Sequence, residues 1–213
     1  KPVVAVITSM AQPLGTHIGN ALEVKDAIDV LAGRTQGDLL EISLLLGSHM
    51  LVLAEKVKTL PEARAMLENA LSSGAGLRKL AEMIAAQGGD PRVVEDLSLL
   101  PQAAVKRVMR AEMAGYLSAM DTTALGMAAQ RMGAGRAKKS DMLDYSVGYV
   151  LHVRLGDEVT EDTLLATLYA RNEAEAEEAE KAIRKALTIA KEKPQTPKLW
   201  DAVVTAEGIT YNR

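Results

Sequence analysis

Residues 12–26 carry oxygen-bearing groups whose types and spacing suit the binding of a hard cation. A chain that turns sharply after a strand leaves backbone carbonyls without a helical or sheet partner, and these need a donor, a water or a cation. Hard cations are bound by carbonyl and carboxylate oxygens. The main-chain oxygens of Leu14 and His17, with the carboxylate of Asp26, therefore form a candidate cation site. The spacing leaves one alternative open, a turn whose carbonyls are satisfied within the protein.

Other residues whose side chains could bind a ligand or catalyse a reaction lie in no pattern that assigns them such a role. His17, His49 and His152 are far apart in sequence and lack metal-ligand spacing, so structural roles are favoured for all three. No serine lies in a G-x-S-x-G motif. The loop of residues 133–139 has two glycines and three basic residues that could hold a phosphate, but it follows a helix, so a helix end and turn is favoured. The acidic run of residues 173–180 is expected to be a solvated helix start without a function.

The composition excludes several classes of protein and several kinds of functional site. The 213 residues are 48% hydrophobic and 25% charged with a net charge of −3, which is typical of a globular chain. The acidic balance, one Trp and no Phe argue against a nucleic-acid partner. The lack of Cys excludes thiolate catalysis and cysteine-bound zinc and fits a reducing compartment. No signal peptide or membrane span is visible, so we expect a cytoplasmic protein without a membrane partner.

The first hundred residues predict one strand and a layer of helices. The β-branched run Val3–Ile7 is typical of a strand covered on both faces. A helix is predicted from Asn20, as N-cap of a capping box with Glu23, to Gly33. Hydrophobic spacing predicts three more helices, at residues 38–57, 61–71 and 77–86. Because the chain starts without Met and enters a strand almost at once, we expect it to be part of a longer protein.

The pattern changes near Pro101, where strands become more frequent. Strands are predicted at residues 105–112, 115–117, 145–154 and 164–169, and helices at residues 122–132 and 172–190. The hairpin pattern of residues 156–166 is similar to the barrel-sandwich modules that carry biotin or lipoate, but no Met-Lys pair lies between its strands. The second half is therefore expected to be a small α+β domain with barrel-sandwich-like strands.

Several motifs resemble the pyrimidine-nucleoside and thymidine phosphorylase family. They are Gln12-Pro13-Leu14-Gly15 with residues 18–24, Ala86-Gln87-Gly88-Gly89-Asp90, Gly133-Ala134-Gly135-Arg136, and Val147-Gly148 leading to Leu155-Gly156-Asp157. The resemblance covers essentially the whole chain, in order. It implies the C-terminal half of such an enzyme, with an overall α+β class. Residues 1–100 would be the C-terminal part of the α/β phosphorylase domain, and residues 101–213 the small α+β domain.

The resemblance also implies a chemistry. Phosphate attacks the anomeric carbon of a pyrimidine nucleoside, which releases the base and leaves ribose or deoxyribose 1-phosphate. The family's phosphate-binding and base-binding motifs lie upstream of this chain, so no catalytic or substrate-binding residue is expected in it and the chain alone should be inactive. A structural potassium ion is implied at Leu14, His17 and Asp26. The family commonly has a small residue at position 17 and Glu at position 26, which makes the carboxylate reach shorter here.

Two other functions stay open at this point. One is a biotinyl-like or lipoyl-like carrier or binding module, which a covalent adduct in a mass spectrum would reveal. The other is a phosphorylase for a different nucleoside or a nucleotide. Family members are homodimers, so a homodimer is implied for the full-length protein.

Overall fold

The computed structural model describes residues 2–212, which form two compact units, each discontinuous in sequence. Unit 1 takes in the described residues of three segments, 1–9, 27–96 and 198–213. Unit 2 consists of Met10–Asp26 and Leu97–Pro197. The mixture of helices and strands confirms the expected α+β class. The expected domains, 1–100 and 101–213, stay a prediction, since the units reflect packing alone.

Unit 1 contains helices whose apolar faces meet. Its helices are the second half of α1 (Asn20–Leu31), α2 (Asp38–Leu53), α3 (Leu60–Ser72) and α4 (Ala75–Ala86). Helix α3 begins with a capping box, in which the Thr59 hydroxyl accepts from the Glu62 N–H and the Glu62 carboxylate accepts from the Thr59 N–H. Val30, Leu40 and Leu44 are buried together. The four predicted helices of the first hundred residues are thus confirmed, with ends shifted by at most a turn or so.

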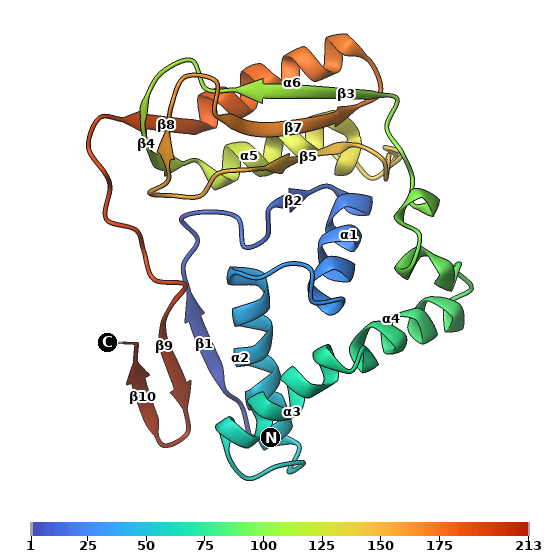
Figure 1. The fold of residues 1–213 in the computed structure, drawn as a ribbon, viewed down its shortest axis with the longest axis vertical. Coiled ribbons are helices and arrows are strands. Elements are labelled where there is room, and N and C mark those ends of the chain that lie inside the picture. The colour runs from blue at the N-terminus through green and yellow to red at the C-terminus, as the bar shows by residue number, and fades with distance from the viewer. Residues whose placement is uncertain (1, 213) are drawn as a thin grey trace. The chain divides into compact units, whose positions relative to one another are not determined.

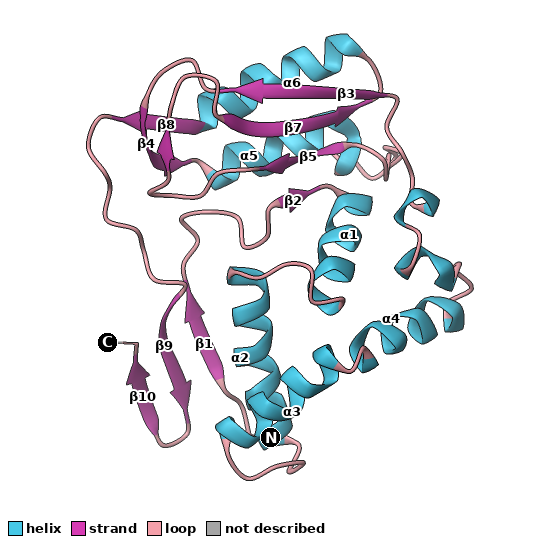
Figure 2. Cartoon of the chain, in the orientation of Figure 1, coloured by secondary structure: helices cyan, strands magenta, loops and turns pink. Residues whose placement is uncertain are grey.

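Unit 1 also contains an antiparallel sheet, in which Figure 2 shows the strands side by side. Its order is β1 (Ala5–Thr8), β9 (Trp200–Thr205) and β10 (Gly208–Tyr211). The prediction that the first strand is covered on both faces is wrong, because Val3 is 70% exposed and Ile7 is 48% exposed. No pattern in the sequence predicted β9 and β10; β9 pairs with β1, almost 200 residues away, and β10 pairs with β9.

Unit 2 is organised around two antiparallel sheets (Figure 1). The larger has the order β2 (His17–Ile18), β5 (Gly148–Leu151), β7 (Leu164–Ala170) and β3 (Val105–Arg110). The smaller has the order β6 (Glu158–Val159), β4 (Gly115–Met120) and β8 (Leu187–Ala190). Two 3₁₀ turns, Pro91–Val94 in unit 1 and Leu97–Leu99 in unit 2, precede β3 in sequence.

Two helices cover one face of the larger sheet and enclose the main core. They are α5 (Thr122–Ala129), which continues into a π-helical turn at Gln130–Ala134, and α6 (Glu173–Ala186). Figure 1 shows α6 running along β3 and β7. Tyr149, Leu168 and Ile183 are fully buried in this core. The Tyr149 hydroxyl donates to the Leu125 carbonyl at 2.8 Å, so the helix and the sheet are joined by a polar contact within the apolar core.

Two details of unit 2 correct the sequence expectations. The helix predicted for residues 172–190 ends at Ala186, and its last four residues form β8, which pairs with β4. Asn20 is not the N-cap but the first residue of α1, and its side-chain amide donates to the Ala134 carbonyl at 2.8 Å. Glu23 instead accepts from the Gly19 N–H at 3.4 Å. The first turn of α1 is therefore tied to the end of the π-helical turn.

Candidate cation site

The short strand β2 orients the backbone of the candidate site. The Leu151 N–H donates to the Thr16 carbonyl at 2.8 Å, and His17 lies opposite Val150. In an antiparallel pair, hydrogen-bonded and non-hydrogen-bonded residues alternate. His17 is therefore in a non-hydrogen-bonded pair, and its carbonyl is directed away from β5. The His17 oxygen therefore faces the outer edge of β2.

Asp26 supplies a buried carboxylate next to the same strand. Asp26 is only 4% exposed to solvent. One carboxylate oxygen, Oδ1, lies 3.5 Å from Nδ1 of His17, whose side chain is 13% exposed. The Thr16 hydroxyl is 3.0 Å from the same ring nitrogen. A buried carboxylate needs a compensating charge or donor, and the imidazole is the contact that this structure provides.

Leu14 is held by a different partner. Arg154 donates to the Pro13 carbonyl at 2.6 Å and, through its other terminal nitrogen, to the Leu14 carbonyl at 3.4 Å. The Leu155 N–H donates to the Gln12 side chain at 2.9 Å, which anchors the turn to the segment after β5. The structure thus brings His17 and Asp26 into contact and attaches Leu14 to Arg154. A carbonyl has two lone pairs, so the long bond from Arg154 leaves Leu14 with acceptor capacity.

Two glycines allow the turn to lie against β5. A Cβ on Gly148 would lie 2.1 Å from the Ile18 carbonyl oxygen, and a Cβ on Gly19 would lie 2.5 Å from the Val147 oxygen. Both glycines have positive φ, +148° and +137°, which residues with a side chain rarely adopt. The approach of these two backbone segments therefore depends on the absence of both side chains.

A basic cavity of about 430 Å³ lies beside His17 within unit 2. Its described lining residues include Lys25, His152 and Arg154, and none of them is acidic. Nε2 of His152 is 2.8 Å from the Thr167 hydroxyl. Burial, and then the charge of Lys106, lower the pKa of His152, which favours the neutral form of its ring. The hydrogen bond to Thr167 is consistent with the structural role expected for His152.

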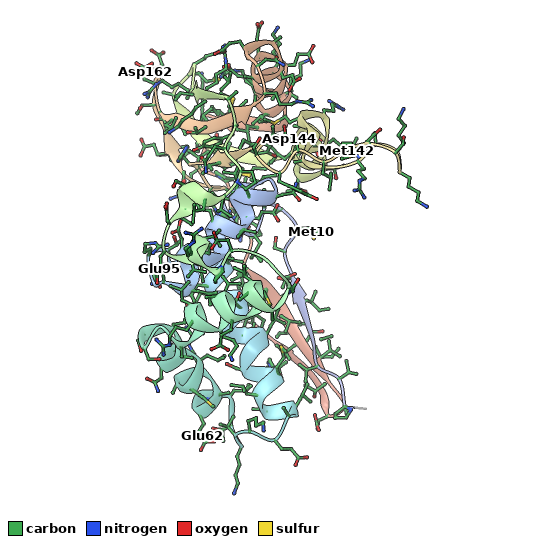
Figure 3. The ribbon with its side chains drawn as sticks, turned by 90° about the vertical axis from the view of Figure 1, so that its right-hand side faces the viewer. Met10, Glu62, Glu95, Met142, Asp144 and Asp162 are labelled. Atoms are coloured by element: carbon green, nitrogen blue, oxygen red, sulfur yellow. The ribbon has the colours of Figure 1, made fainter. Side chains whose placement is uncertain are left out.

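The glycine-containing loop after α5 forms a helix end. Gly133, with φ +106°, lies in the π-helical turn, and its carbonyl accepts from the Asp144 N–H. The N–H groups of Ala137 and Lys138 donate to the Asp141 carboxylate at 3.1 and 3.0 Å. Met142, which Figure 3 labels on this loop, is 89% exposed. The loop is thus a helix end followed by a turn closed by Asp141, the arrangement favoured by the sequence.

The remaining sequence-derived candidates gain no ligand set. Burial lowers the pKa of His49 on α2, and its Nε2 is buried without a hydrogen-bond partner. Within residues 2–212 no three His, Cys, Asp or Glu side chains are grouped so that they could hold a metal ion. The tip between β6 and β7 is Thr160-Glu161-Asp162-Thr163, and Figure 3 labels Asp162 there. This tip has no lysine to carry a biotinyl or lipoyl group.

No pattern in the sequence indicates that Lys25 and Arg154 lie beside the site. Arg154 is about 140 residues from the turn that it holds, and only the pairing of β2 with β5 brings the two together. The pairing involves two residues of β2, too few for an alternating pattern to be recognised. A long-range contact of this kind leaves no local signal.

Similarity to known proteins identifies the family. A family model described as the pyrimidine nucleoside phosphorylase C-terminal domain matches residues 116–190. The chain is 47% identical over 173 residues to a pyrimidine-nucleoside phosphorylase of Geobacillus stearothermophilus, and 48% identical over 173 residues to one of Bacillus subtilis (strain 168). Each alignment covers 81% of this chain and 40% of the relative. A pyrimidine-nucleoside phosphorylase of Staphylococcus aureus (strain USA300) is 43% identical over 186 residues, 87% of this chain and 43% of the relative.

The chain therefore spans about two fifths of the length of these curated relatives. The matched family model is a C-terminal domain, so the chain corresponds to a C-terminal portion of such an enzyme. These similarities confirm the expected relationship and do not favour a carrier module. The chain belongs to the pyrimidine-nucleoside phosphorylase family.

Proposed function

We propose that the protein containing this chain catalyses the reversible phosphorolysis of pyrimidine nucleosides. Phosphate would attack the anomeric carbon, the bond to the base nitrogen would break, and the products would be the free base and a pentose 1-phosphate. The observation that carries this proposal is 47% identity over 81% of the chain to a pyrimidine-nucleoside phosphorylase. The reaction is that of a pentosyltransferase, with phosphate as co-substrate.

We propose further that the residues that bind phosphate and base lie in the part of such enzymes that this chain does not span. The proposal is supported by the coverage of about two fifths of the relatives. We also infer a cytoplasmic homodimer for the full-length protein, without a nucleic-acid partner. Among the described residues, no helix combines the length and the apolar character that a membrane crossing requires.

The activity is tested with the full-length polypeptide and the 213-residue chain side by side. Full-length protein is expected to release uracil or thymine from uridine or thymidine only when phosphate is present, and the chain alone is expected to release none. Free base is measured by chromatography, with a reaction lacking phosphate as control. No phosphate-dependent release by the full-length protein would refute the function. Turnover by the chain alone would refute the placement of the substrate-binding residues.

We propose that potassium is held by the carbonyls of Leu14 and His17 and the carboxylate of Asp26. The residues fit such an ion in two respects. The carboxylate is buried, and the His17 carbonyl is directed away from β5, toward the side of β2 that its own sheet does not occupy. The ion would fix the turn after β1 by joining three oxygens from two elements.

Asp26→Ala is expected to weaken activation of the full-length enzyme by potassium. Removing a charged ligand should raise the potassium concentration for half-activation on the order of tenfold or more. The measurement is initial rate against KCl, with choline chloride holding the ionic strength constant. Asp29→Ala is a matched control, because Asp29 lies on the same helix and pairs with Arg34 at 2.7 Å. Equal potassium dependence in the two variants would refute the site.

A further inference from the structure

The basic cavity beside His17 adjoins a second cavity in unit 2. The basic cavity, of about 430 Å³, and the second, of about 250 Å³, have two lining residues in common, Lys25 and Tyr169. All the residues that line the two cavities belong to unit 2. A volume of a few hundred Å³ is typical of a small-molecule site. The two cavities therefore form one candidate pocket, with Lys25 and Tyr169 at the junction.

The charges of the basic cavity favour an anion. Its described lining includes Lys25 and Arg154 and no carboxylate. Asp26 is not among the lining residues, because it is buried and contacts His17 at 3.5 Å. Arg154 is engaged by the Pro13 carbonyl at 2.6 Å, so Lys25 is the cation with donors to offer a ligand. An anion here would be attracted by a cation without meeting a carboxylate in the described lining.

Lys25 and Tyr169 have hydrogen-bond donors that the described residues do not use. Lys25 is half-buried, and its ammonium group makes no hydrogen bond or ion pair within residues 2–212. An ammonium group has three donors, and a phenol has one. The Tyr169 hydroxyl likewise has no hydrogen-bond partner in the part of the chain that the structure describes. A ligand oxygen at the junction of the two cavities could therefore accept from both side chains.

Lys106 supplies a second ammonium group beside Tyr169. It lies on β3, where it pairs with Tyr169 on β7, and its Nζ is 5.9 Å from the centroid of the Tyr169 ring. Its charge is, after burial, the second cause of the lowered pKa of His152, another lining residue of the basic cavity. No described carboxylate forms an ion pair with Lys106. Two ammonium groups without a carboxylate partner among the described residues therefore lie close to Tyr169.

The second cavity has a neutral lining. Apart from Lys25, none of its described lining residues is charged, and Leu97, Leu100 and Pro101 supply apolar side chains. The Gln102 amide already donates to the Leu97 and Leu100 carbonyls, at 3.3 and 2.8 Å. This cavity therefore suits the uncharged part of a molecule whose anionic group lies beside Lys25.

We propose that this pocket binds a small phosphomonoester, with the phosphate in the basic cavity and the uncharged part in the second cavity. A phosphomonoester carries a charge of about −1.5 to −2 at pH 7 and three strong acceptor oxygens. It therefore matches two ammonium groups and a hydroxyl group better than a carboxylate with a single charge does. The proposal goes beyond phosphorolysis and does not depend on it.

The test measures the reactivity of Lys25 and Lys106 in the full-length wild-type protein. The protein is acetylated briefly with N-hydroxysuccinimidyl acetate, and the acetylation of each lysine is followed by mass spectrometry of its peptides. The probe is ribose 5-phosphate, with sodium chloride holding the ionic strength constant. Saturating probe is expected to slow acetylation of both lysines about tenfold or more, because an amine that is hydrogen-bonded to phosphate is not free to react. Unchanged acetylation of Lys25 and Lys106 would overturn the proposal.

Lys185 is the matched control within unit 2. It lines a different cavity, whose lining also includes Glu175 and Glu178, so its acetylation should not respond to the probe. Lys106→Gln is expected to raise the ribose 5-phosphate concentration for half-protection of Lys25 about tenfold, whereas Lys185→Gln should leave it unchanged. Equal effects of these two variants would overturn the pocket.

The chemical class of the ligand is tested with two further probes. Ribose lacks the phosphate, and gluconate replaces it with a carboxylate, so each is expected to protect Lys25 much less than ribose 5-phosphate does at the same concentration. Protection by either compound equal to that by ribose 5-phosphate would refute the assignment to a phosphomonoester.

Discussion

Gly148→Ala is expected to destabilise unit 2 by about 3 kcal/mol or more, the largest effect of any substitution considered. The added Cβ would lie 2.1 Å from the Ile18 oxygen, 2.9 Å from the Gly19 Cα and 3.0 Å from a Leu22 methyl group. Two of these neighbours are backbone atoms, which cannot move aside by a change of rotamer. A positive φ costs a residue with a side chain about 1–3 kcal/mol, and overpacking costs a further ~1–3 kcal/mol.

Gly208→Ala separates these two contributions. Gly208 has φ +145°, close to the value at Gly148, but a Cβ there would meet no atom within 4 Å. The control therefore carries the backbone strain without the collision. Urea unfolding followed by circular dichroism should show a clearly larger loss for Gly148→Ala than for Gly208→Ala. Equal losses would contradict the close approach of β2 and β5.

Glu180→Gln is expected to cost unit 2 roughly 2 kcal/mol, because charge-assisted hydrogen bonds are worth about 1.5–3 kcal/mol before screening. Glu180 accepts from Arg107 at 2.6 Å and from Arg184 at 2.9 Å, and its side chain is 17% exposed. Arg184 also donates to the Arg110 carbonyl at 2.9 Å. The carboxylate therefore joins α6 to β3, and glutamine would preserve its shape while removing its charge.

The same carboxylate should make stability depend on pH. Burial acts to raise the pKa of Glu180, but the hydrogen bonds from Arg107 and Arg184 outweigh it and hold the pKa below the ordinary value of 4.5. A group with a lowered pKa in the folded state stabilises the protein above its unfolded pKa, and this contribution is lost as the pH falls through the folded value. The wild type should therefore lose stability below about pH 4.5 more steeply than Glu180→Gln.

Glu177→Gln is the control for Glu180→Gln, because it removes another carboxylate from the same helix, α6. Glu177 pairs with Lys181 at 2.6 Å, but both side chains are more than half exposed. Exposed pairs of this kind contribute little because water and salt screen them. Denaturant midpoints between pH 3 and 7 should distinguish the two variants. A Glu180→Gln curve parallel to that of the wild type would show that the Arg107 and Arg184 contacts do not hold the carboxylate.

The local elements of the fold could be predicted well from the sequence. The periodicity of α2 and the capping residues Thr59 and Glu62 of α3 act within a few residues, so they leave a readable pattern. β8 could not be recognised in this way, because Leu187–Ala190 continues the apolar spacing of α6. Its strand form depends on pairing with β4, some 70 residues earlier.

The candidate site could be formulated from the sequence only in part, and it stays a prediction. Leu14, His17 and Asp26 follow one another closely, so their oxygens could be grouped from spacing alone. The side-chain contact between His17 and Asp26 was not predicted, because the spacing suggested a role only for the main-chain oxygen of His17. The role of Arg154 depends on the pairing of β2 with β5, which no nearby residue specifies.

The pairing of β1 with β9 sets an order of events during synthesis. Ala5 lies opposite Val204, so β1 leaves the ribosome 199 residues before its partner exists. At about 5–20 residues per second, this delay is roughly 10–40 s. Throughout that time β1, which contains Val6 and Ile7, would lack the strand that covers this edge. A chaperone that holds extended apolar segments would therefore be needed most at the beginning of this chain, long before its helices have finished packing.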